Sequence, residues 1–137
     1  MSSYLSFYIV PKRKTEKEPK RYILISSYSR NSDIYQAFEE NISIVWSGDG
    51  NKYTTLTQDN VNLVQNDLAS DISKTKDRLV EYEKYASSNP EYIQEIVETK
   101  EYLSDLQYTQ AKISFIADML EDMNFYNEIE EICCHFS

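Results

Sequence analysis

Cys133, Cys134 and His135 are the one place in this 137-residue chain where soft metal ligands gather. A zinc site needs four ligands in a tetrahedron, and adjacent residues point in different directions on a helix and to opposite faces of a strand. A second pair of ligands is missing, because the chain has two Cys and one His in total. The same geometry argues against a cysteine nucleophile with His135 as its base. We therefore expect the cluster to be structural.

Pairs of carboxylates are the other candidate for chemistry, because two acids one helical turn apart can act as general acid and base. Asp67 with Asp71 and Asp118 with Asp122 have this spacing. On an exposed helix such pairs are usually solvated surface, and the sequence marks none of them as buried. The sequence therefore predicts a protein that is not an enzyme and that holds no metal and no cofactor.

Two groups of side chains suit the binding of a protein partner. Tyr82, Tyr85 and Tyr92 lie near the tip of a predicted helical hairpin, where aromatic residues either anchor a partner or cap the hairpin's own core. The second group belongs to the region from Asp118 onward, which has no Lys or Arg and should attract basic partners while repelling nucleic acid and anionic membranes. Its predicted contact residues are Asp118, Glu121, Asp122, Glu128 and Glu131. The alternative is a surface that only confers solubility.

A basic segment contrasts with this acidic end. Residues 1–30 carry seven basic and two acidic side chains, whereas the whole chain has a net charge of −9. The cations at residues 11–22 are Lys12, Arg13, Lys14, Lys17, Lys20 and Arg21. With the tyrosines of the flanking strands (Tyr4, Tyr8, Tyr22 and Tyr28) they form a candidate platform for single-stranded nucleic acid. We expect the long helices to bury these rings instead, and the net charge opposes binding to a polyanion.

The first 56 residues are predicted to form a small sheet with one helix. Residues 3–10 and 21–28 alternate in the period of a strand. Ser32 and Asp33 are cap candidates for a short helix over 33–41. Residues 44–46 and 53–56 are β-prone, and the turn between them holds both glycines, which predicts a hairpin. The expected order is β-β-α-β-β.

Residues 57–124 are predicted to form a long antiparallel helical hairpin, packed like a coiled coil. Apolar residues recur every three or four positions, with a break at Asn89 and Pro90 that starts the second helix. Each helix should extend about 45 Å. The expected core positions are Leu68, Ile72, Leu79, Leu103 and Leu106.

The last segment, 125–137, is predicted to be a short amphipathic helix. Phe125, Ile129, Ile132, Cys133 and Phe136 have helical spacing, although so short a segment also permits a strand. The fold class is therefore α+β in a single domain, residues 1–137. This domain combines a sheet-containing region (residues 1–56), the hairpin (residues 57–124) and the C-terminal segment.

These features favour a cytoplasmic protein-interaction module. The first ten residues lack the basic region of a signal peptide, no apolar run is long enough to span a bilayer, and two adjacent Cys suit a reducing compartment. We expect an inhibitor, immunity-type or assembly factor that binds a basic protein through its helical surface. The main alternative is a mimic of nucleic acid that blocks a DNA- or RNA-binding protein. Competition by nucleic acid would distinguish the two.

The hairpin also predicts self-association. The apolar stripe that contains Ile93, Ile96, Val97, Ile113 and Ile116 is wider than one partner helix needs. A second copy of the chain would cover the remainder, so a homodimer is expected.

Overall fold

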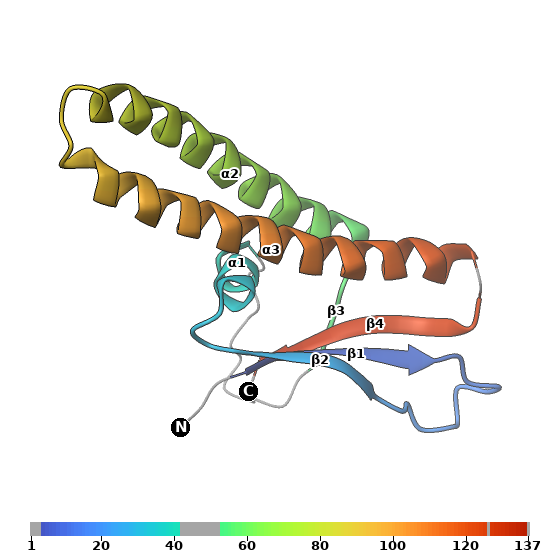
Figure 1. The fold of residues 1–137 in the computed structure, drawn as a ribbon. Helices are drawn as coiled ribbons and strands as arrows, with labels where there is room; N and C mark the ends of the chain where they lie inside the picture. The colour runs from blue at the N-terminus through green and yellow to red at the C-terminus, as the bar shows by residue number, and fades with distance from the viewer. Residues whose placement is uncertain (1–3, 42–52, 126, 137) are drawn as a thin grey trace.

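A small sheet, a short helix and two long helices make up the portion of the chain that the structure describes (Figure 1). The computed structural model describes residues 4–41, 53–125 and 127–136. Its elements are β1 (Tyr4–Pro11), β2 (Ile23–Ser29), α1 (Asp33–Asn41), β3 (Thr54–Thr55), α2 (Gln58–Ala86), α3 (Tyr92–Phe125) and β4 (Ile129–Phe136). All strand pairs are antiparallel, and the helices lie on one face of the sheet. The α+β class and the helical hairpin are confirmed.

The hairpin starts at a capping box. The hydroxyl of Thr57 accepts a hydrogen bond from the backbone N–H of Asn60 at 3.1 Å, and the Asn60 side chain accepts one from the Thr57 N–H at 3.3 Å. This reciprocal pair satisfies two donors that a helix start otherwise leaves without partners. The turn after α2 ends with the Tyr92 N–H donating to the carbonyl of Asn89 at 3.1 Å. The 34 residues of α3 then extend about 50 Å, beyond the edge of the sheet (Figure 1).

The C-terminal segment is a strand, so the prediction of a helix was wrong. The sheet order is β2-β1-β4-β3, which places β4 between β1 and β3 in the interior of the sheet. Ile132, Cys134 and Phe136 join the core beneath the helices, as alternation on a strand requires. The apolar positions of this short segment fit both the helical and the strand period, and only pairing with the distant strand β1 decides between them.

The predicted second hairpin lies only partly within the described residues. Thr54–Thr55 forms a strand, but its partner is β4, with Thr54 opposite Cys134 and Thr55 opposite Cys133. The expected partner, residues 44–46, lies outside the described residues. Among the described residues, two strands, a helix and a strand precede the helical hairpin, and the last strand follows it.

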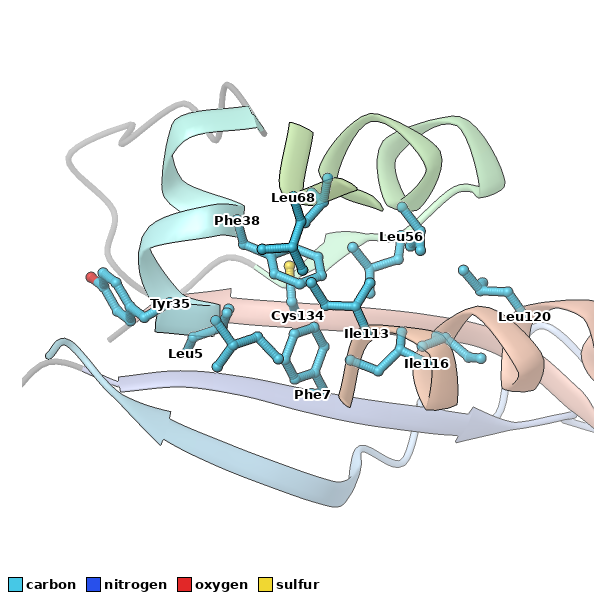
Figure 2. Packing of buried hydrophobic residues seen from close by; sticks show 14 of the residues in the cluster. Leu5, Phe7, Tyr35, Phe38, Leu56, Leu68, Ile113, Ile116, Leu120 and Cys134 are labelled. Atoms are coloured by element: carbon cyan, nitrogen blue, oxygen red, sulfur yellow. The ribbon is translucent and has the colours of Figure 1, made fainter. Parts of the chain in front are cut away.

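The core fills the space between the sheet and the helices (Figure 2). It combines residues from every layer: Leu5 and Phe7 on β1, Tyr35 and Phe38 on α1, Leu68 on α2, Ile113, Ile116 and Leu120 on α3, and Cys134 on β4. The expected core positions Leu68, Ile72 and Leu106 are buried, whereas Leu79 and Leu103 are only partly buried. The outer half of the hairpin has no sheet beneath it (Figure 1), and its apolar residues Val80, Ile93 and Val97 are exposed.

Candidate protein-binding surfaces

An acidic groove lies where α1 meets the helical hairpin. It has a volume of about 90 Å³, and all three helices contribute to its wall. The lining residues are Asp33, Gln36, Ala37 and Glu40 from α1, Asp67, Leu68 and Asp71 from α2, and Tyr102 and Leu106 from α3. Four carboxylates therefore surround a cavity whose remaining lining includes apolar side chains.

The packing of α1 determines which of its residues reach the groove. Ile34, Tyr35 and Phe38 are buried, so the neighbouring face of this helix, which carries Asp33 and Glu40, is left beside the hairpin. At the end of α1, the side-chain amide of Asn41 donates to the carboxylate of Asp67 at 3.0 Å. This hydrogen bond joins α1 to α2 at the groove.

The field of the groove is negative. Burial raises the pKa of the Tyr102 hydroxyl, and the charges of Asp71 and Asp33 raise it further, while Arg78 acts in the opposite direction. The phenol therefore remains protonated at neutral pH and can donate a hydrogen bond. Carboxylates beside a phenol and aliphatic side chains suit a cation with an apolar stem, such as the side chain of Arg or Lys.

Sequence reasoning did not find this groove. Its acids come from two segments more than 25 residues apart, and each segment alone reads as solvated helix surface. The available signal was the pair Asp67 and Asp71, whose spacing places both on one face of α2.

The three tyrosines predicted at the hairpin tip do come together. The ring centroids of Tyr82 and Tyr92 are 5.9 Å apart, and those of Tyr85 and Tyr92 are 5.5 Å apart. The Tyr85 hydroxyl also donates to Glu81 at 3.3 Å, and the charge of Glu81 raises the pKa of Tyr85. The rings thus cover the end of the hairpin, with Tyr85 the most exposed of them.

The predicted acidic site is divided between two environments. Asp118, Glu121 and Asp122 are exposed on α3, and Glu128 is exposed before β4. Glu131 lies on the face of β4 that points away from the helices, and its side chain is 12% exposed. It forms an ion pair with Lys20 at 2.9 Å and accepts a hydrogen bond from Thr55.

Two acids of β4 neutralise part of the positive charge of the basic segment. Arg13 forms an ion pair with Glu130 at 3.0 Å and also donates to the carbonyls of Glu16 and Glu18. This ion pair and the pair of Lys20 with Glu131 connect the basic loop to the acidic C-terminal region. The pairing of β4 with β1 brings them together, because the basic loop directly follows β1.

The helices do not cover the tyrosine face, so that expectation was wrong. Tyr8, Tyr22 and Tyr53 cluster on the opposite face of the sheet, where Tyr22 and Tyr53 stack with centroids 3.9 Å apart. Tyr28 instead packs against the core, since a register shift opposite Phe7 and Tyr8 places an extra residue in β2 and reverses the alternation.

The two thiols lack the properties of nucleophiles. Burial raises the pKa of Cys133 to about 11 and that of Cys134 to about 12, and both side chains are fully buried. A thiol must ionise to attack an electrophile or bind a metal, so burial keeps both inert at neutral pH. Among the described residues, no group of three metal-ligating side chains is close enough to hold an ion.

Replacing Glu131 by Gln is expected to reduce stability at pH 7. Burial alone would raise the pKa of Glu131, but hydrogen bonds from Thr55 and Lys20 and the charges of Lys20 and Arg13 outweigh it and lower this pKa. A lowered folded-state pKa gives stability that is present above the unfolded value of 4.5 and is lost as the pH falls. Urea unfolding between about pH 7 and about pH 3 should show the difference between wild type and variant shrinking on acidification.

The exposed Glu121→Gln is the matched control for that measurement. It removes the same charge from α3, where no ion pair is formed within the described residues, and should leave the pH profile unchanged. Equal profiles for wild type and Glu131→Gln would contradict the role assigned to the ion pair.

Comparison with known proteins does not place this chain in a family. Within residues 4–41, 53–125 and 127–136, no helix combines the length and apolar character needed to cross a membrane. No protein-family model, curated protein or solved structure matches the chain.

Proposed function

We propose that this protein is a non-enzymatic interaction module, of the inhibitor, immunity or assembly-factor type, that binds a basic protein through the acidic groove. The observation that carries the proposal is the convergence of Asp33, Glu40, Asp67 and Asp71 from two helices on one cavity. The groove would take a single Arg or Lys side chain of the partner, with the exposed acids of α3 attracting it from a distance.

The lining supports a basic side chain more than a free metal ion. Leu68 and Leu106 offer apolar surface for the methylene stem, and the Tyr102 hydroxyl adds a hydrogen-bonding group beside the carboxylates. Arg would fit best, because its planar fork can bond two carboxylates at once. A partner side chain of this kind would be recognised by shape as well as by charge.

The proposal can be tested with a peptide in which Arg is flanked by Leu and with a matched peptide in which citrulline replaces Arg. NMR titration should shift the amide signals of groove residues such as Ala37 and Leu68 for the Arg peptide only. The double variant Asp33→Asn/Asp71→Asn should weaken binding at least about ten-fold. Asp118→Asn/Asp122→Asn removes the same charge from α3 outside the groove, so it should act through the association rate alone and weaken binding by no more than about two-fold.

The controls separate the proposal from nucleic-acid mimicry. If both double variants weaken binding equally, the groove has no special role, and a diffuse acidic surface that mimics nucleic acid becomes the better account. Circular dichroism melts of both variants check that the fold is intact. Equal binding of the Arg and citrulline peptides would contradict the proposal directly.

The stacked pair Tyr22 and Tyr53 favours single-stranded nucleic-acid binding as a second candidate function. Both rings are exposed, and Lys12, Lys14 and Arg21 lie in the adjacent loop. The ion pairs of Arg13 and Lys20 and the net charge of −9 weigh against it. A labelled oligothymidylate added to the same titration distinguishes the two, because shifts would then appear at the sheet and not at the groove.

A further inference from the structure

The outward side of α3 carries a second apolar stripe that does not contribute to the core. Ile93 is 57% exposed, Val97 46%, Tyr108 67% and Phe115 58%. Steps of 4, 11 and 7 residues separate them, and each step is close to a whole number of helical turns. The buried residues of α3, such as Leu106, Ile113 and Ile116, fall on the other side of the helix. The helix is therefore apolar on two opposite sides.

We propose that this stripe is the interface with a second copy of the chain, packed antiparallel along α3 about a two-fold axis near Ser104. The surface is distinct from the acidic groove, because the groove residues Tyr102 and Leu106 lie on the inner side of α3. The proposal is thus independent of the function proposed above.

The spacing of the stripe is self-complementary. Including the exposed positions between the four large residues, it runs through residues 93, 97, 100, 104, 108, 111 and 115, in steps of 4, 3, 4, 4, 3 and 4. This order reads the same in both directions, so a two-fold axis at Ser104 sets every stripe residue opposite another. Such self-matching is the requirement of an isologous dimer.

The residue types at the matched positions are compatible with close packing. Ile93 would lie opposite Phe115, Val97 opposite the small Ala111, and Lys100 opposite Tyr108, whose ring Lys112 of the same chain already contacts at 4.3 Å from the centroid. The small side chain of Ser104 at the axis would let the two helices approach closely.

A dimer of a chain with net charge −9 must also keep its acids apart. In this register no acid of residues 91–117 faces another: Glu95 would lie opposite Ile113, Glu98 opposite Gln110, Glu101 opposite Gln107 and Asp105 opposite Leu103. The acidic end of α3, with Asp118 and Asp122, would lie beside residues 86–90 of the partner, the uncharged hairpin tip. The register thus keeps the acids of α3 from lying directly opposite one another.

The exposed area is of the size that a dimer needs. If each large side chain has the about 150 to 250 Å² of an aromatic residue as an upper guide, the four at these exposures offer about 340 to 570 Å² per copy. The stems of Lys100 and Lys112 and the small residues of the stripe bring the total towards the about 800 Å² per partner of a standard interface. Ile93 and Val97 lie in the first turns of α3. This end of the hairpin projects beyond the sheet (Figure 1), so the dimer would give the projection a structural use.

Sedimentation equilibrium of the full chain tests the proposal. At about 100 μM the wild type should have twice the 16.1 kDa mass of one chain. Phe115→Glu should raise the dimer dissociation constant at least about 100-fold. Leu63→Glu, which changes an apolar residue of similar exposure on α2, should remain dimeric. Because both side chains are exposed, each variant should keep the wild-type circular dichroism spectrum.

A cross-link tests the register. Ser104→Cys should form an intermolecular disulfide under mild oxidation, since the two copies of residue 104 meet at the axis, while Gln94→Cys should not. The buried Cys133 and Cys134 do not compete. A wild type that stays at the mass of one chain, a dimer that survives Phe115→Glu, or the absence of the Ser104→Cys cross-link would each overturn the proposal.

Discussion

Replacing Phe38 by alanine is expected to lower the free energy of unfolding by about 4 kcal/mol. Phe38 is fully buried on α1, and its ring meets that of Phe7 edge to face with centroids 5.1 Å apart. In Figure 2 it points from α1 into the cluster that joins the sheet to the long helices. The substitution removes the ring from all these contacts and leaves a cavity that rigid neighbours cannot close.

Urea unfolding followed by circular dichroism measures this loss. Leu63→Ala on the exposed side of α2 is the control, with an expected change below about 1 kcal/mol. A change below about 1 kcal/mol for Phe38→Ala as well would mean that α1 is not anchored to the core. The acidic groove would then lose one of its walls, so this experiment also bears on the proposed function.

The elements with strong local patterns were predictable from the sequence. The first long helix was found by apolar residues that recur at helical spacing without a Gly or Pro, and it begins at Gln58, one residue after the predicted start at 57. The short helix at residues 33–41 was found by its cap and its spacing, and the structure has the same bounds. In each case the information lies within a few turns of chain.

The features that depend on distant partners were not predictable. β4 is a strand because β1, more than 100 residues away, pairs with it, and its own apolar spacing fits two periods. The ion pairs of Glu130 and Glu131 with the basic loop, and the groove between α1 and α2, follow from the same long-range packing. The side of the sheet on which Tyr28 lies depends on a register shift that alternation alone cannot indicate.

Replacing Cys133 by proline is expected to destabilise the protein by about 4 kcal/mol or to prevent folding. Cys133 is fully buried in the middle of β4, opposite Tyr8 of β1 on one side and Thr55 of β3 on the other. A proline in an interior strand removes a backbone donor and leaves a buried acceptor without its hydrogen bond. Cys133→Ala keeps the backbone donor and should cost about 1 kcal/mol, measured by the same urea unfolding.

A second proline variant, placed just before β4, is the matched control for Cys133→Pro. Glu128→Pro changes an exposed residue just before β4, whose carbonyl accepts from the Lys12 N–H at 3.0 Å and would be retained. It should therefore be tolerated within about 1 kcal/mol. If the segment were instead a terminal helix outside the sheet, Cys133→Pro would unfold that helix alone and leave the unfolding of the strands and the hairpin unchanged. Near-native stability of Cys133→Pro would thus contradict the interior position of β4, and with it the pairing that holds Glu130 and Glu131 against the basic loop.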